Sequence, residues 1–112
     1  MKKVETSKGK EYEAPGHFKV FTMRLQGKEE TGTKNVWLGM SHFLPGGGAE
    51  MGSSTSEKIY FVLSGILTVV MKDKHEIVIG PMDSLYVPAG EERSLINREK
   101  LPVSMLVFST YT

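Results

Sequence analysis

The sequence predicts an all-β fold, a barrel or a sandwich of short strands within a single domain. Its 112 residues include 12 glycines and 5 prolines. These turn-forming residues separate short apolar segments at intervals of roughly eight to twelve residues, which is typical of sandwiches and barrels. Apolar residues do not recur at helical spacing over successive turns in any window. A chain of this length fits one domain with its own hydrophobic core.

The first part of the chain is expected to form an arm and two strands. Residues 1–16 are polar, contain a Pro-Gly pair and predict an N-terminal arm ahead of a barrel that spans residues 17–112. In residues 18–25, apolar and polar side chains mix in the manner of a half-buried strand. Residues 26–35 are a polar loop with two glycines, and residues 36–44 are a second strand that a Pro-Gly-Gly-Gly run ends.

The later strands are short and separated by turn residues. Residues 58–63 are rich in aromatic and β-branched side chains, and a Ser-Gly pair leads into the next strand. The remaining strands are expected at residues 66–71, 76–79, 84–87, 93–97 and 103–109. Because residues 59–63 are apolar at every position, both faces of that strand should be covered, one inside the barrel and the other by a second sheet or a second subunit.

Composition argues against several classes of function. The formal net charge is +1, from 14 basic and 13 acidic residues, and gives no electrostatic reason to expect a nucleic acid or a membrane surface as partner. The absence of cysteine excludes disulfides and thiolate chemistry. The basic N-terminus is not followed by an apolar segment, so we expect no signal peptide, and no apolar run is long enough to span a bilayer. We therefore expect a cytoplasmic protein.

Two segments resemble the paired sequence motifs of the cupin superfamily. The first motif, G-x5-H-x-H-x3-E-x6-G, fits residues 46–65 without a gap. Gly52 and Ser54 stand where the family has two histidines, and Lys58 stands where it has a glutamate. The phrase Tyr-Phe-Val-Leu-Ser-Gly at the end of this segment is very similar to the strand and turn that close the motif in many cupins.

The second segment, residues 82–97, resembles the motif G-x5-P-x-G-x2-H-x3-N. Pro88, Gly90 and Asn97 match it, whereas Arg93 replaces the histidine. The resemblance implies a small single-domain cupin with degenerate metal-binding motifs. Its fold would be a double-stranded β-helix, also called a jelly-roll barrel.

The departures from the motifs bear on metal binding. In metal-containing cupins, three histidines and a glutamate hold iron, manganese or a similar ion. Here the four positions carry Gly52, Ser54, Lys58 and Arg93. Glycine has no side chain, serine is a poor ligand, and the two cations repel a divalent ion. We therefore expect no metal at the usual position and no cofactor.

A metal site shifted from the usual position stays open, with His42, Glu50 and Glu57 as candidate ligands. Strand alternation points Glu57 away from Lys58, but a one-residue bulge would reverse that. His42 shares a strand face with Met40 and reaches the pocket only if that face lines the barrel. In the other case His42 is a hydrogen-bonded structural residue.

The residues at the former ligand positions predict a different kind of site. Alternation puts Lys58, Tyr60 and Val62 on one face, and Arg93 would point inward from the facing strand. Two cations and a phenol suit an anionic small molecule, because arginine offers a planar fork to a carboxylate or phosphate and lysine adds a point charge. Ser54, in a loop over the mouth, and His42 complete the ligand-binding candidates, with Met40 and Met105 as part of an apolar floor.

Three classes of function stay open, and we favour the binding of a small anionic metabolite of carboxylate or sugar type. The second class is a metal-independent isomerase, epimerase or lyase. In such an enzyme burial and Arg93 lower the pKa of Lys58, which acts as base, and Tyr60 acts as acid. The third is a non-catalytic assembly or partner module, which a cavity filled by its own side chains would favour.

Two further expectations concern charge pairing and assembly. If Lys58 or Arg93 pairs with Glu57, Glu91 or Glu92 at the rim, these cations need no ligand. Small cupins resemble one another in forming dimers by sheet packing, and residues 59–63 offer apolar surface for it. We therefore expect a homodimer.

Overall fold

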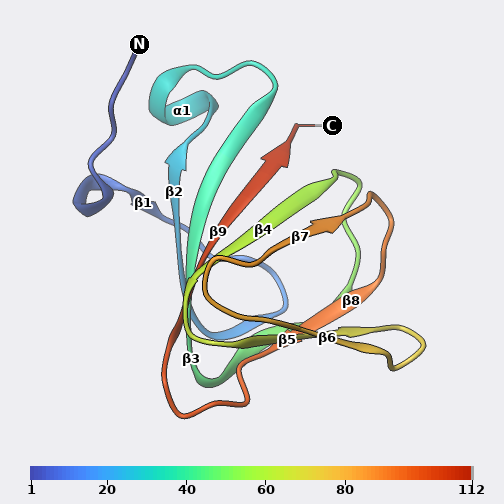
Figure 1. Cartoon of the computed structure of the whole chain (residues 1–112). Coiled ribbons are helices and arrows are strands. Elements are labelled where there is room, and N and C mark those ends of the chain that lie inside the picture. Colours follow the sequence, from blue (N-terminus) through green and yellow to red (C-terminus); the bar gives the residue numbers. More distant parts are fainter. Residues whose placement is uncertain (112) are drawn as a thin grey trace.

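The computed structural model describes residues 1–111 and confirms the all-β fold predicted from the sequence (Figure 1). Its regular elements are strands apart from one short α-helix and one 3-10 turn. In chain order they are η1 (Thr6–Lys8), β1 (Lys10–Glu11), β2 (His17–Gln26), α1 (Lys28–Thr31), β3 (Val36–Gly52), β4 (Lys58–Ser64), β5 (Leu67–Met71), β6 (Glu76–Ile79), β7 (Ser84–Val87), β8 (Arg93–Ile96) and β9 (Val103–Thr110). Residue 112, the last of the expected barrel range, lies outside the described residues.

The strands form one curled sheet, the nearly closed jelly-roll barrel that the sequence predicts. Their order is β6-β5-β8-β3-β9-β4-β7, with β2 paired to β3 and β1 paired to β2. The long strand β3 joins the two halves of the barrel, because its first part pairs with β9 and its last part with β8 (Figure 1). The pairings are antiparallel throughout.

The prediction that the Pro-Gly-Gly-Gly run ends the second strand is wrong, because β3 continues through it to Gly52. Gly46 adopts a φ of 80°, which costs glycine little, and there the strand passes from β9 to β8. Gly48 lies so close to β8 that a Cβ atom would stand 1.9 Å from the carbonyl oxygen of Leu95. These glycines permit close packing of strands instead of a turn.

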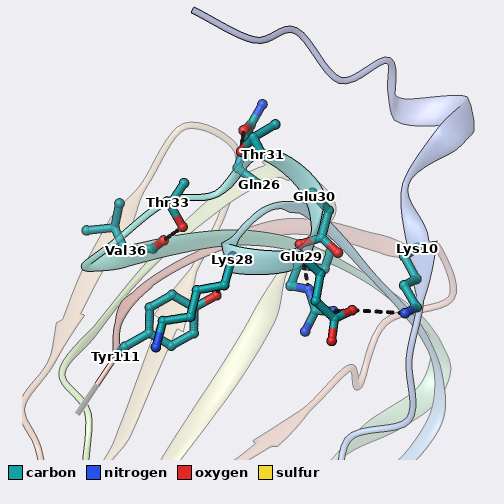
Figure 2. A network of polar contacts seen from close by, with 10 residues as sticks. Lys10, Gln26, Lys28, Glu29, Glu30, Thr31, Thr33, Val36 and Tyr111 are labelled. Carbon is teal, nitrogen blue, oxygen red and sulfur yellow. Dashed lines mark hydrogen bonds and ion pairs between the residues drawn. The ribbon is translucent and has the colours of Figure 1, made fainter.

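The polar loop expected before β3 contains the helix α1, so the prediction of a chain without any helix is wrong for four residues. Ion pairs hold this turn: Arg24 Nη2 lies 2.9 Å from Glu29 Oε2, and Arg24 Nε lies 2.8 Å from Glu30 Oε1. Figure 2 shows Lys10 reaching Glu29 from the arm, with Nζ and Oε2 2.9 Å apart. Charge pairing stabilises this turn, and Gly32, in the left-handed conformation, ends it. Neither feature produces an apolar periodicity in the sequence.

The N-terminal arm lies against the barrel. Strand β1 pairs with β2 in antiparallel register. The backbone N–H of Tyr12 donates to the Thr22 carbonyl at 3.1 Å, and the Thr22 hydroxyl donates to the Tyr12 carbonyl. Burial raises the pKa of the Tyr12 phenol. These contacts hold residues 12–15 against the barrel wall.

The interior of the barrel holds one hydrophobic core, built from alternate residues of the strands. Its buried members are Phe43, Tyr60, Val62, Leu67, Val69, Ile79, Val87, Leu95, Val103, Met105 and Val107. Within residues 59–63, the inward side is buried in a single chain and the outward side is only partly covered. Ile59 is 44% exposed on the outer face, where it pairs across β9 and β7 with Phe108 (42%) and Tyr86 (57%). The expected homodimer through this face stays a prediction.

The longest helix of the described chain is α1, and no helix there has the length and hydropathy to cross a membrane.

Candidate functional site

A cavity of about 380 Å³ lies between β3, β4, β8 and β9, and the N-terminal arm forms part of its wall. Both polar and apolar side chains line it. The sequence-predicted members among them are Ser54, Lys58, Tyr60 and Arg93. Apolar residues, including Met105 from the expected floor, line the rest. The cavity is not filled by the barrel's own side chains, and this weighs against a barrel that serves only as an assembly module.

Lys58 is the first residue of β4, and its side chain lines the cavity. Its Nζ donates to Ser109 Oγ at 3.2 Å and stands 4.8 Å from the centre of the Trp37 ring, close enough for a cation–π contact. Burial, together with the positive charge of Arg93, lowers the pKa of Lys58. The direction of this shift agrees with the one predicted from the sequence, and a role of Lys58 as a base stays a prediction.

Arg93 begins β8 and is bound to Tyr60, which lies on the same inward face of β4 as Lys58. Arg93 Nη2 and Nε donate to Tyr60 Oη at 2.8 and 3.3 Å. Arg93 Nη1 donates to the carbonyl oxygens of Gly52 at 3.3 Å and Glu91 at 3.5 Å. The guanidinium is therefore fixed in orientation by neutral acceptors.

The alternative in which the two cations pair with acids at the rim does not hold. Within residues 1–111, neither Lys58 nor Arg93 takes part in an ion pair. Glu92 pairs instead with Lys72, at 3.0 Å. The cavity thus contains two neighbouring positive charges with no carboxylate bound to either.

His42 and Met40 do not reach the cavity. The inward residues of this part of β3 are Ser41 and Phe43, so His42 lies on the opposite face. Its Nδ1 is 2.9 Å from Ser104 Oγ, which fits the alternative of a hydrogen-bonded structural histidine. Met40 shares that outer face, so the expectation that it forms part of the pocket floor is wrong.

The donor set does not fit the metal that the fold family implies. The positions of the family's ligands carry a glycine, a serine and the two cations, which offer no suitable set of lone pairs to a divalent ion. Among the described residues, no three histidine or carboxylate side chains come together in a way that could hold a metal. Of the shifted candidates, Glu50 lines the cavity, His42 lies on the outer face, and Glu57 is exposed.

Several residues that line the cavity were not predicted as ligand contacts from the sequence, among them Trp37, Glu13, His17 and Glu50. Trp37 lies in register with the inward residues of β3 and lines the cavity. Glu13 comes from the arm, His17 from the start of β2, and Glu50 from the end of β3. Alternation along β3 is a signal that could have found Trp37. Glu13 reaches the cavity only through the packing of the arm, which the sequence pattern does not reveal.

The environment of Lys58 predicts a pH-dependent change in stability. Its pKa is lower in the folded chain than in the unfolded chain, so the unfolded chain binds more protons between the two values. The free-energy cost of burying the charged Lys58 side chain is fully present below its pKa in the folded chain. This cost disappears as the pH rises through its pKa in the unfolded chain. Lys58→Met should therefore stabilise the folded chain at neutral pH and raise its Tm. The gain in the free energy of unfolding should be no more than about 1 kcal/mol, because solvent screens part of the charge.

Thermal unfolding at neutral and alkaline pH measures this effect, with Lys100→Met, at an exposed site, as control. The gain from Lys58→Met should shrink toward alkaline pH. A variant that is less stable than the wild type at neutral pH would show that the lysine stabilises the barrel.

Comparison with known proteins agrees with this architecture. The cupin domain family model matches residues 39–109. A Mycobacterium tuberculosis protein named beta-D-galactosidase Rv1717 is 42% identical to this chain over 107 residues, which cover 96% of this chain and 91% of that protein.

Two solved structures illustrate the likeness of fold. The polyketide cyclase RemF from Streptomyces resistomycificus superposes with a TM-score of 0.87 and 21% identity, over 98% of this chain and 79% of that one. A sugar phosphate isomerase of the cupin superfamily from Silicibacter pomeroyi superposes with a TM-score of 0.80 and 20% identity, over 99% of this chain and 76% of that one. The family model and the 42% identical relative together show that the chain belongs to the cupin domain family.

Proposed function

We propose that the protein binds a small anionic metabolite, a carboxylate of sugar-acid type, in the cavity beside Lys58 and Arg93. The observation that carries the proposal is a pair of cations in one cavity, neither of which forms an ion pair within residues 1–111, although Glu13 and Glu50 also line that cavity. Bringing two positive charges together in a partly buried site is unfavourable unless an anion compensates them. A carboxylate between the guanidinium and the ammonium group would do so with charge-assisted hydrogen bonds.

The size and walls of the cavity support a small polar ligand. A volume of about 380 Å³ is near the lower end of the range for ligand sites, which begins at roughly 300 Å³. Trp37 offers an apolar ring surface, and Ser54 and Tyr60 add hydroxyl groups. A wall of this mixed character suits a molecule with both C–H and O–H groups, such as a monosaccharide derivative.

The relatives also support a sugar-type ligand. The 42% identical protein carries the name of a galactosidase, and one of the structural neighbours is a sugar phosphate isomerase. We therefore take D-galacturonate and D-galactose as probes, since galacturonate keeps the sugar ring and adds a carboxylate at the terminal carbon.

Isothermal titration calorimetry on the wild-type protein tests the proposal with this pair of sugars. D-Galacturonate should bind at least roughly tenfold more tightly than D-galactose, because only the acid compensates the cations. Raising the salt concentration should weaken binding of the acid only, and a chelator should change neither affinity. Equal affinities, or loss of binding with chelator, would contradict the proposal.

A second candidate function is catalysis on the bound sugar. The name of the 42% identical relative suggests glycoside hydrolysis, which generally uses a pair of carboxylates, and Glu13 and Glu50 line the same cavity. The metal-independent isomerase or lyase predicted from the sequence would instead use Lys58 and Tyr60. Product analysis with a nitrophenyl galactoside and with D-galacturonate separates these reactions. Glu50→Gln should abolish the first while Lys58→Arg leaves it in place.

A further inference from the structure

We infer that Lys58 forms an imine with the carbonyl group of an anionic substrate, a keto acid or an open-chain sugar acid whose carboxylate binds Arg93. This inference rests on the proposed function, because it uses the same carboxylate site. It adds a covalent role for the lysine and a second requirement on the ligand, a free aldehyde or ketone next to or near the acid group.

The geometry around Lys58 favours its amine as a nucleophile. Ser109 is a neutral partner at 3.2 Å, and Lys58 has no ion pair with a carboxylate within residues 1–111 that would hold it as an ammonium ion. The charge of Arg93 and burial both favour the neutral amine. A desolvated lysine next to another cation is the usual environment of lysines that attack carbonyl carbons.

The neighbours of Lys58 supply the other groups that the reaction needs. The guanidinium of Arg93 is oriented by its bonds to Tyr60 and to the backbone, and it can hold the carboxylate of the substrate. Tyr60 lies two residues after Lys58 on the same inward face of β4. Tyr60 Oη accepts two N–H groups from Arg93, so its own proton points elsewhere and is free to move to the substrate oxygen.

The reaction balances without an external reagent. The lone pair on Lys58 Nζ attacks the carbonyl carbon, and a C–N bond forms as the C=O π pair moves to oxygen. That oxygen takes a proton from Tyr60, and Nζ gives one back to the Tyr60 phenolate, which leaves a carbinolamine. The Tyr60 phenol then protonates the hydroxyl group, which leaves as water while the nitrogen lone pair forms the C=N bond, and the remaining proton on that nitrogen returns to Tyr60. The net change is one amine and one carbonyl group converted to an imine and water.

Reductive trapping with glyoxylate tests the inference. Glyoxylate is the smallest anionic aldehyde, and sodium cyanoborohydride converts its imine with lysine to a stable carboxymethyl-lysine. Peptide mapping by mass spectrometry should find this group on Lys58 at least roughly tenfold faster than on Lys100, because Arg93 would hold the glyoxylate carboxylate beside the Lys58 amine. Propionaldehyde, which has no carboxylate, should show a smaller preference for Lys58. Arg93→Leu should reduce the labelling of Lys58 by glyoxylate.

Two variants and one binding measurement separate the possible outcomes. Lys58→Arg keeps the positive charge but forms no imine, so the preferential label should vanish while D-galacturonate still binds. Lys100→Arg should leave labelling of Lys58 unchanged. If glyoxylate labels Lys58 no faster than Lys100 while D-galacturonate binds, the imine inference is wrong and the proposed function stands. If D-galacturonate does not bind, the proposed function is wrong, and labelling of Lys58 then decides on the imine alone.

Discussion

Arg93→Leu is expected to weaken the binding of D-galacturonate by a factor of about 10 to 100. A hydrogen bond to a charged group contributes roughly 1.5 to 3 kcal/mol, and the variant loses both the positive charge and the one Nη2 N–H that is not already donated to Tyr60, Gly52 or Glu91. Arg93 also holds Tyr60 in place through bonds of 2.8 and 3.3 Å, so the phenol loses its orientation as well. Calorimetric titration with the acid gives the affinity.

Arg98→Leu is the matched control for this experiment. Arg98 follows the same strand but forms an exposed ion pair with Glu76, at 2.7 Å, and does not line the cavity. Its removal should leave the affinity unchanged. Arg93→Lys, which keeps a charge without the fork, should show an intermediate loss. If Arg93→Leu binds the acid as well as the wild type does, the cavity is not the carboxylate site.

Gly48→Ala should destabilise the barrel by about 3 kcal/mol. A Cβ atom at this position would stand 1.9 Å from the carbonyl oxygen of Leu95 and 3.1 Å from the Cα atom of Ile96. Both neighbours are backbone atoms of β8, so no side chain can move to make room. The strands β3 and β8 would have to separate where Gly48 pairs with Ile96.

Urea unfolding measures this loss, with Gly80→Ala as the control. A Cβ atom at Gly80 would meet only Asp83 Oδ2, at 3.7 Å, an ordinary contact with a side chain. The control should change stability by less than about 0.5 kcal/mol beyond the intrinsic difference between the two residues. If Gly48→Ala is as stable as the control, then β3 and β8 do not pack this closely.

Much of the fold was predictable from the sequence, because turn residues mark the ends of short strands and the two motifs fix their order. The exception in β3 has a physical cause: a Pro-Gly run signals a turn, but here close strand packing requires the glycines. Gly48 cannot be told from a turn glycine without knowing that the backbone of Leu95 and Ile96 lies against it.

The inward face of β3 was less predictable than that of β4. Both faces of β3 carry apolar residues, so alternation does not say which side is inside. The inner face combines Trp37 with the small residues Gly39 and Ser41, and a Cβ at Gly39 would stand 3.0 Å from the Trp37 ring. Small inward residues leave room for the cavity, but in the sequence they resemble polar surface positions. For this reason His42, on the more apolar outer face, was a candidate.

The set of Lys58, Tyr60 and Arg93 was predictable because two independent patterns agree. Motif spacing puts Lys58 and Arg93 at former ligand positions, and alternation along β4 adds Tyr60 to the same face. The arm residues that line the cavity, such as Glu13, come from a segment with no strand periodicity. Only the packing of β1 on β2 brings them there.

The most direct measurement is a crystal structure of the protein grown with D-galacturonate. The sugar should occupy the cavity, with its carboxylate within hydrogen-bonding distance of the Arg93 guanidinium and near Lys58 Nζ. Electron density for the sugar outside the barrel, or a transition metal held deep in the cavity by protein side chains, would show that these two cations do not form an anion site.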